Sequence, residues 1–208
     1  MWEVDIISMS FGFEAEDANI EASLKNAEKN DVLLIAAASN VGGDHVDAFC
    51  WPAATRDNVM CMYATDGKGQ PYAENPRWCK EKYRFATLGV MVPGYARPDD
   101  HGISHEVHRS GTSISTPAAA GVAACVLSFV WQMEAIYIET ARSETKGASE
   151  RFQLAKGRLF RASGMNKVFE KMTDADGNNG FHFVHPWRLF DGNTTSTTLI
   201  ENIVNCLI

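Results

Sequence analysis

The chain has 208 residues, of which 45% are hydrophobic and 22% charged, and its formal net charge is −7 at pH 7. These proportions are typical of a soluble globular chain of one domain or slightly more. The acidic balance gives no electrostatic support for nucleic-acid binding. The longest small-residue apolar run, Ala118 to Trp131, is shorter than the ~18 apolar residues that a membrane span needs, so we expect no membrane contact.

The beginning of the chain and the cysteines indicate a compartment. Met1 to Asp5 lack both the basic and the apolar region of a secretory signal, and they enter a buried-strand pattern at once. The five cysteines are odd in number, and their spacings match no metal motif. We expect a cytoplasmic location, with Cys61 and Cys125 as reduced core residues.

The first part of the chain has the pattern of a parallel α/β sheet. Val4–Ser10 and Asp31–Ala38 predict two strands, and Ala15–Asn30 between them predicts an amphipathic helix. A continuous apolar run such as the second strand is typical of a parallel strand that is covered on both faces. Strand, helix and strand within ~35 residues form one βαβ unit. Further strands are predicted at residues 58–64 and 89–92.

The remaining chain alternates polar segments with helical ones. Residues 65–84 and 99–109 predict irregular surface structure. A helix of small residues is expected from about Thr112 to Val130, followed by a charged and weakly helical stretch. A short helix is predicted at Gly164–Met172 and a short strand at Phe181–Val184.

The most informative stretch is Ser110-Gly-Thr-Ser-Ile-Ser-Thr-Pro117, which three alanines and a glycine follow. It places Ser113 after a glycine turn and at the start of a helix, where unpaired backbone N–H groups and a partial positive charge are found. A serine in that position can be a nucleophile and part of an anion-binding site, which indicates acyl transfer. Pro117 suits the first helical turn, where no N–H partner is needed.

A second polar stretch follows the buried strand. Ala36–Gly43 ends that strand and places Asn40 at its carboxyl end, where open α/β sheets bind their ligands. The side-chain amide of Asn40 can donate to an oxyanion. The alternative is that Asn40 only caps a turn beside Gly42.

Five motifs between Val4 and about Val130 resemble those of the subtilisin-like serine proteases (subtilases), in the same chain order. The nucleophile motif is matched with Ser115 where alanine is commoner, and the oxyanion-asparagine motif with Ser39 in place of glycine. The matching segments are Ile7–Gly12, Ala38–Gly42, Trp51–Ala54 with Asn58-Val59, Val92–Gly94 and Gly111–Pro117.

The resemblance implies a serine endopeptidase with a subtilisin-like, three-layer α/β fold and a mostly parallel sheet. Ser113 would attack the scissile carbonyl, and its own backbone N–H and the Asn40 side chain would hold the charge of the tetrahedral intermediate. Ser10, Phe11 and Gly12 would pair with the extended backbone of a peptide or protein substrate. The alternative for Phe11 is a core aromatic residue. We expect no cofactor and no metal ion.

The general base has no counterpart in the expected place. Subtilases carry their triad in the order Asp, His, Ser, whereas no histidine precedes Asn40 in this chain and His45 is the first. The run Asp99-Asp100-His101-Gly102 lies in the wrong order for the fold, and a solvated loop is the better interpretation. His105 and His108 are expected to be surface residues.

The resemblance also divides the chain. We expect residues 1–132 to be a partial subtilase catalytic domain, incomplete at the N-terminus, and residues 133–208 to be a helical or irregular extension packed on it. An active endopeptidase and a truncated, inactive fragment or interaction module remain two alternatives. The missing N-terminal half of the same domain is a candidate partner, because an open strand edge and exposed apolar surface are expected near Val4–Ser10 and Leu33–Ala38.

Two weaker signals lie near the C-terminus. Asp174-x-Asp176-x-Asn178 has the opening spacing of a calcium loop, but the later positions of such a loop are not matched, so we expect a polar turn. Gly164–Phe169 and Pro186-Trp187 are similar to the tail of fungal subtilase domains in large intracellular proteins.

Overall fold

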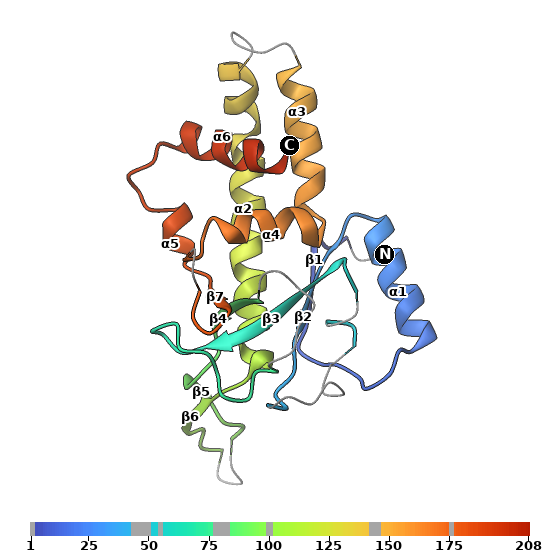
Figure 1. Cartoon of the computed structure of the whole chain (residues 1–208), viewed down its shortest axis with the longest axis vertical. Helices are drawn as coiled ribbons and strands as arrows, with labels where there is room; N and C mark the ends of the chain where they lie inside the picture. Colours follow the sequence, from blue (N-terminus) through green and yellow to red (C-terminus); the bar gives the residue numbers. More distant parts are fainter. Residues whose placement is uncertain are drawn as a thin grey trace.

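Five parallel strands form a sheet in the order β1-β2-β3-β4-β7. The computed structural model describes residues 3–42, 51–53, 56–76, 84–98, 102–141, 147–174 and 177–208. The strands of the sheet are β1 (Ile6–Met9), β2 (Leu33–Ala37), β3 (Val59–Thr65), β4 (Arg84–Leu88) and β7 (Phe181–Phe183). A separate antiparallel pair, β5 (Val92–Tyr95) and β6 (Glu106–Arg109), extends beyond one end of the sheet (Figure 1).

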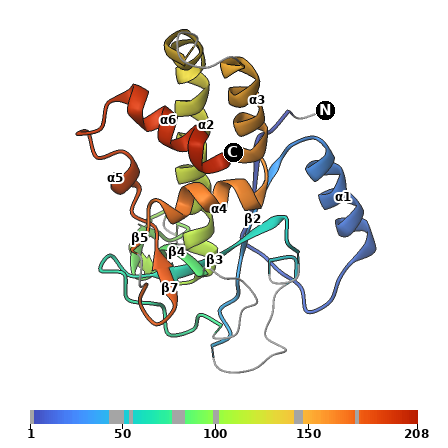
Figure 2. The same ribbon diagram turned by 45° about the horizontal axis from the view of Figure 1, so that its top comes forward.

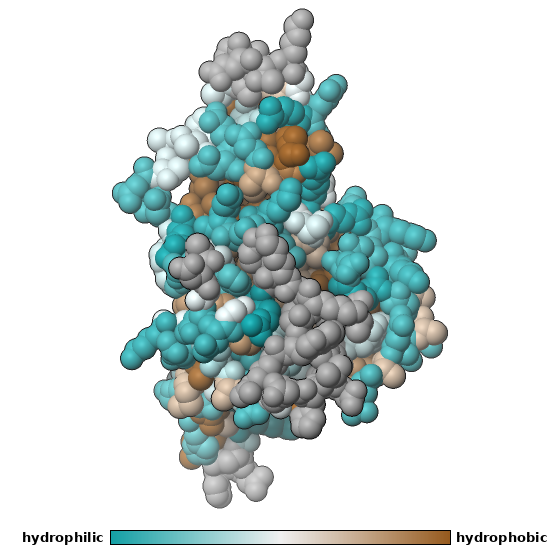
Figure 3. Space-filling view, in the orientation of Figure 1, coloured by the Kyte–Doolittle hydropathy of each residue, from teal (hydrophilic) through white to brown (hydrophobic). Residues whose placement is uncertain are grey.

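Helices cover both faces of this sheet (Figure 2). Helix α1 packs on one face, and α2 and α4 pack on the other, while α3 and α6 lie against α2. Figure 3 shows mostly hydrophilic residues where α1 reaches the surface. The helices are α1 (Ala18–Lys29), α2 (Thr112–Ala141), α3 (Ala148–Leu159), α4 (Ala162–Glu170), α5 (Pro186–Leu189) and α6 (Ser196–Leu207).

The two faces of the sheet have separate hydrophobic cores. Leu33 and Ile35 belong to the core that α2 covers, whereas Leu34 and Ala36 belong to the core that α1 covers. Successive side chains of a strand point to opposite faces, so β2 needs apolar residues at every position. This confirms the predicted strand and explains its continuous apolar run. The expected exposure near Leu33–Ala38 was wrong, because β2 lies between β1 and β3 and both of its faces are covered. The arrangement is the predicted α/β fold with a mostly parallel sheet.

Three predicted boundaries were wrong. The predicted strand at 89–92 overlaps β5 only at Val92, because the Gly89 and Val90 N–H groups both bond to Thr65 O and the chain turns at Met91, which has a φ of 54°. The predicted loop at 99–109 contains β6. Helix α2 continues to Ala141, well past Val130, because its second half packs against α3 and α6. The predicted division at residues 132 and 133 therefore falls inside an unbroken helix.

Helix α2 is buried on one side only. Ala119, Ala123 and Val126 lie in the core, and α2 contacts β1, β2, β3 and β4. Cys61 is buried as predicted, but Cys125 is exposed, so that prediction was wrong. The exposed residues of α2 recur every three or four positions, and we call them the outer face of α2: Pro117, Ala118, Gly121, Ala124, Cys125, Ser128, Trp131, Gln132, Ala135, Ile136, Glu139 and Thr140.

Because its outer face is also largely apolar, α2 is apolar on nearly all sides. By length and composition the helix is apolar enough to cross a membrane, and 39% of its most apolar window is buried. However, α2 contacts four strands of the sheet, as a core helix does, and a core helix can be equally long and apolar. A helix that is apolar all round is normally covered on all sides, so the outer face is unusual for a solvated surface.

Two backbone positions hold the ends of β2 and α2 together. Ser39 is buried and has a φ of 149°, and Gly111 is buried with a φ of 145°. Both values lie in the region that glycine adopts more readily than other residues. A Cβ on Gly111 would lie only 3.1 Å from the side-chain nitrogen and oxygen of Asn40. Glycine is therefore required at 111, and Ser39 is strained.

We predict that Ser39→Gly stabilises the chain by about 1 kcal/mol, because it relieves a strained backbone. Within the described residues, the Ser39 side chain makes one hydrogen bond that the substitution removes, the long 3.3 Å bond that Oγ accepts from the Val41 N–H. Urea denaturation with an unchanged m-value measures the effect. Gly111→Ala should lower the free energy of unfolding, because it adds a Cβ at a position with positive φ. A loss of stability in Ser39→Gly would contradict the inference that the Ser39 backbone is strained.

A buried ionic contact joins α1 to the segment before β3. The guanidinium of Arg56 donates to the carboxylates of Glu21 and Glu28, and the three side chains are only 13–16% exposed. The bond from Arg56 holds the pKa of Glu21 below its ordinary value. Since the folded pKa is the lower one, the contribution to stability is present at neutral pH and is lost as the pH falls through the acid range.

We predict that Arg56→Met lowers the melting temperature at pH 7, and that the gap to the unmodified chain narrows as the pH falls below about 5, where carboxylates protonate. Thermal unfolding between pH 7 and pH 3 measures this. Lys25→Met is the control, since Lys25 pairs with the same Glu21 but its side chain is 62% exposed. A difference in melting temperature that does not change with pH would show that the stabilisation by Arg56 is not ionic.

Candidate functional site

The end of β1 and the start of α2 meet at two serines. Ser10 Oγ donates to the backbone carbonyl of Ser113 at 2.9 Å, and Ser113 Oγ donates to the backbone carbonyl of Ser10 at 3.2 Å. The two residues are 103 positions apart in sequence. The structure thus brings together Ser10 and Ser113, which the sequence motifs indicate separately.

Pro117 accounts for half of this contact. It lies inside α2, in the second turn and not in the first as predicted. In a regular helix the Ser113 carbonyl would accept from the N–H four residues on, but proline has none. Ser10 Oγ supplies the missing donor to that carbonyl. The proline thus leaves an acceptor at the helix start that ties the serine loop to β1.

Asn40 is held at the same helix start. Its Oδ1 accepts from the Thr112 backbone N–H at 2.7 Å and from Thr112 Oγ1 at 3.2 Å. Thr112 Oγ1 also lies 3.2 Å from the backbone carbonyl of Ser39. Because the backbone N–H can only donate, these bonds fix Oδ1 toward Thr112 and leave the amide Nδ2 for another acceptor.

One backbone N–H at the start of α2, that of Ser113, has no hydrogen-bond acceptor among the described residues. The N–H groups of Ile114 and Ser115 bond to Gly111 O, and that of Thr112 bonds to Asn40. Within the described residues no acceptor lies within hydrogen-bond range of the Ser113 N–H. A helix N-terminus with an unpaired N–H favours a negatively charged group. Ser113, this N–H and Asn40 therefore form a site suited to an oxyanion.

The base is the part that the described residues do not supply. Ser113 Oγ has a carbonyl as its partner, which accepts a hydrogen bond but does not take up the proton at neutral pH. His105 and His108 are exposed, as predicted, and lie by or on β6. His45 and the run Asp99 to His101 lie outside the described residues.

The other predicted substrate-binding residues follow Ser10. Phe11 is 53% exposed, so its alternative as a core residue was wrong, and Gly12 is half-buried. Ser115, which departs from the family motif, is buried and donates to Thr112 O at 2.9 Å. Sequence reasoning missed Thr112 as the residue that orients Asn40. Its place at the first helical position, next to Ser113, is the signal that could have found it.

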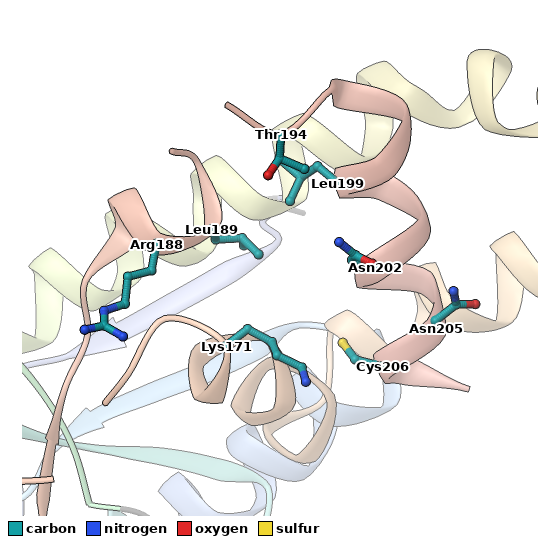
Figure 4. Close-up of a pocket in the computed structure, with 8 residues that line it drawn as sticks. All are labelled: Lys171, Arg188, Leu189, Thr194, Leu199, Asn202, Asn205 and Cys206. Carbon is teal, nitrogen blue, oxygen red and sulfur yellow. The ribbon is translucent and has the colours of Figure 1, made fainter. Parts of the chain in front are cut away.

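A cavity of about 560 Å³ lies elsewhere, between α4, α5 and α6 (Figure 4). Burial raises the pKa of the Cys206 thiol, which keeps it protonated and weakly nucleophilic at neutral pH. Arg188 is already paired with Asp174. The cavity is lined by Lys171, Arg188, Leu189, Thr194, Leu199, Asn202, Asn205 and Cys206. It is separate from the serine site and offers no activated nucleophile.

Asp174 and Asn178, the described residues of the calcium-like spacing, contact other protein groups. Asp174 pairs with Arg188 and lies 3.4 Å from His185 Nε2, and the Asn178 amide donates to Gly69 O at 3.3 Å. Asp176 lies outside the described residues. Two backbone bonds between Asn178 and Phe181 confirm the predicted tight turn.

Comparisons with known proteins identify the family of the chain. The chain is 28% identical over 137 residues to the subtilisin-like protease het-Q2 of Podospora anserina, covering 64% of this chain and 36% of that protein. It is 32% identical over 127 residues to a thermostable alkaline protease of Halalkalibacterium halodurans, covering 59% of this chain and 31% of that protein. The chain thus spans about a third of these relatives.

A solved structure, that of the patellamide maturation protease PatA, is similar over 95% of this chain and 63% of its own, with 25% identity and a TM-score of 0.58. The sequence model described as "Subtilase family" matches residues 2–168. The match covers β1, the loop after β2 and the start of α2, which carry Ser10, Asn40 and Ser113. The chain belongs to the subtilase family.

Proposed function

We propose that this chain is the part of a serine endopeptidase that carries the nucleophile and the oxyanion site. The observation that carries the proposal is the joint position of Ser113 and Asn40 at the start of α2, with Oδ1 of Asn40 held by the Thr112 N–H at 2.7 Å. Membership of the subtilase family supports the same reaction class. Peptides or proteins are the substrates in this proposal.

In the proposed reaction, Ser113 Oγ attacks the scissile carbonyl carbon and forms a new C–O bond. The hydroxyl first leaves the Ser10 carbonyl, and its proton passes to a general base. The negative charge then on the substrate oxygen is held by the Ser113 N–H and by Asn40 Nδ2. Collapse of this intermediate breaks the peptide bond, and the base returns the proton to the leaving amine. The alignment of these donors before reaction is what makes such a site effective.

We propose that the base reaches Ser113 on the N-terminal half of the subtilase domain, as a partner of the surface described here. Strand β1 pairs only with β2 among the described strands, so its other edge is open. The outer face of α2 is apolar, carries Glu139 as its one charge, and begins beside Ser113. A strand added to β1 and a helix laid on α2 would cover both and would complete the site.

The alternative is a truncated, inactive fragment or an interaction module. The resting position of the Ser113 hydroxyl favours it, since the hydroxyl donates to the Ser10 carbonyl, which cannot act as a base. A serine without a base is a weak nucleophile. The two proposals differ in one property, the reactivity of Ser113 once a segment with Asp and His is present.

We predict that a fluorophosphonate probe does not label the 208-residue chain, and that it labels Ser113 in an extended chain, to which an N-terminal subtilase segment with the Asp and His has been joined. Intact-protein and peptide mass spectrometry locate the label, with Ser113→Ala as the control. In the extended chain, Asn40→Ala should slow peptide hydrolysis by about 10²–10³, the magnitude known for such a donor in subtilisin itself. Labelling of the short chain would contradict the proposal that the general base lies on the N-terminal half. An extended chain that is not labelled would favour the inactive alternative.

We predict that Ala124→Glu on the outer face of α2 prevents the short chain from binding the N-terminal half, because a carboxylate would be buried without a partner. Ala124 is exposed in the chain described here, so its thermal unfolding should stay unchanged. Size-exclusion chromatography of the mixed halves measures binding. Ser163→Glu, an equally exposed change on α4, should bind as the unmodified chain does. Equal binding by both variants would exclude α2 as the contact surface.

A further inference from the structure

The cavity between α4, α5 and α6 has no part in the proposed reaction. Its volume of about 560 Å³ is that of a small-molecule site. Helices α5 and α6 follow residue 168, where the match to the subtilase family ends. The cavity is therefore formed largely by a segment beyond that match.

One side of the cavity is apolar. Leu189 of α5 and Leu199 of α6 line it, and their side chains point into the space between these helices in Figure 4. The Asn202 amide points into the same space, and within the described residues it has no hydrogen-bond partner. A ligand here would meet apolar surface and one uncommitted amide.

Two lysines make the α4 side of the cavity positive. Lys171, the C-cap of α4, lines the cavity, and Lys167 precedes it by four residues on the same side of the helix. In the part of the chain that is described, neither side chain makes a hydrogen bond or an ion pair. Like charges at this spacing repel each other, so an anion bound beside them would relieve that repulsion.

The thiol of Cys206 on α6 is close enough to sense both charges. Burial raises its pKa, the ammonium groups of Lys171 and Lys167 oppose that rise, and the carboxylate of Glu170 has the smallest effect. The thiol donates to Ile203 O at 3.1 Å and stays protonated at neutral pH. Among the described residues that line the cavity, none is an aspartate or a glutamate.

The loop before α6 gives the cavity a direction. Thr194 lines the cavity on that side, and its backbone N–H donates to Asp191 at 2.9 Å. This bond holds the pKa of Asp191 below its ordinary value, so the loop carries a negative charge at neutral pH. Arg188, the other cation of the lining, is paired with Asp174. An anionic group is therefore favoured at Lys171 and repelled from the loop.

We propose that this cavity binds a small amphiphilic anion, with its carboxylate or phosphate head at Lys171 and Lys167 and its apolar body against Leu189 and Leu199. Both heads accept hydrogen bonds from ammonium groups, and burial of the body removes apolar surface from water. The site does not depend on Ser113 or on the proposed peptidase reaction.

Titration calorimetry with the 208-residue chain tests the site at constant ionic strength. Octanoate and octyl phosphate carry head and body, octanol carries only the body, and acetate and inorganic phosphate carry only the head. A complete probe should bind about tenfold tighter than any partial one, the scale of one hydrogen bond to a charged group. The tighter of the two complete probes identifies the head.

Methyl NMR of the leucines locates the bound probe. The signals of Leu189 and Leu199, assigned with the Leu189→Ile and Leu199→Ile variants, should shift on binding. The signal of Leu154 should not shift, since this exposed residue lies on α3 and does not line the cavity.

Lys171→Met and Lys167→Met should each weaken the binding of the complete probes, by up to about tenfold, and leave that of octanol unchanged. Lys29→Met is the matched control, because Lys29 is exposed and lies in the last turn of α1, as Lys167 does in α4. Lysines that only complement a helix dipole would change thermal unfolding alike in all three variants and leave affinity unchanged. That result, no saturable binding of a complete probe, or methyl shifts away from Leu189 and Leu199 would overturn the site.

Discussion

The contact on which the rest of the site depends is the bond between Asn40 and the first amide of α2. A helix start needs acceptors for its unpaired N–H groups, and the end of β2 provides one in Asn40 Oδ1, at 2.7 Å from the Thr112 nitrogen. The same bond fixes which end of the amide side chain is free to donate. It therefore joins strand to helix and orients the oxyanion donor at once.

The close approach of these two ends requires unusual backbone on both sides. Gly111 has no room for a side chain beside Asn40, and Ser39 keeps a φ of 149° although glycine would be easier there. Such strain persists where the surrounding structure fixes the backbone. Pro117 adds a further constraint, because it frees the Ser113 carbonyl for the hydroxyl of Ser10. The serine loop is thus held from β2 and from β1.

The long helix α2 links this site to an exposed apolar surface of the molecule. Its inner side crosses the sheet, and its second half carries α3 and α6, which accounts for its length beyond the small-residue run. Its outer face is apolar and begins beside Ser113. Ser113, which needs a general base, and the exposed outer face of α2 are therefore neighbours. In the proposed function, a single partner segment could supply the base and also cover this face.

Much of this could be predicted from the sequence. The apolar run of β2, the helix pattern of α1 and the short helix α4 follow from local periodicity, and Ser113 and Asn40 follow from their motifs. The proton path, the substrate pairing of Gly12 and the division of the chain stay predictions. The strand at 89–92, the loop at 99–109 and the place of Cys125 were wrong, because short polar segments and helix faces depend on what packs against them.

The sequence by itself indicated the family, the strands β1, β2, β3 and β7 of the central sheet, and the two residues of the proposed oxyanion site, because these follow from patterns along the chain. The tertiary structure decided which groups meet: Ser10 with Ser113 across 103 residues, Asn40 with Thr112, and Phe13 with Trp51. It also decided that one face of α2 is left uncovered. These are contacts between distant segments, and no local pattern specifies them.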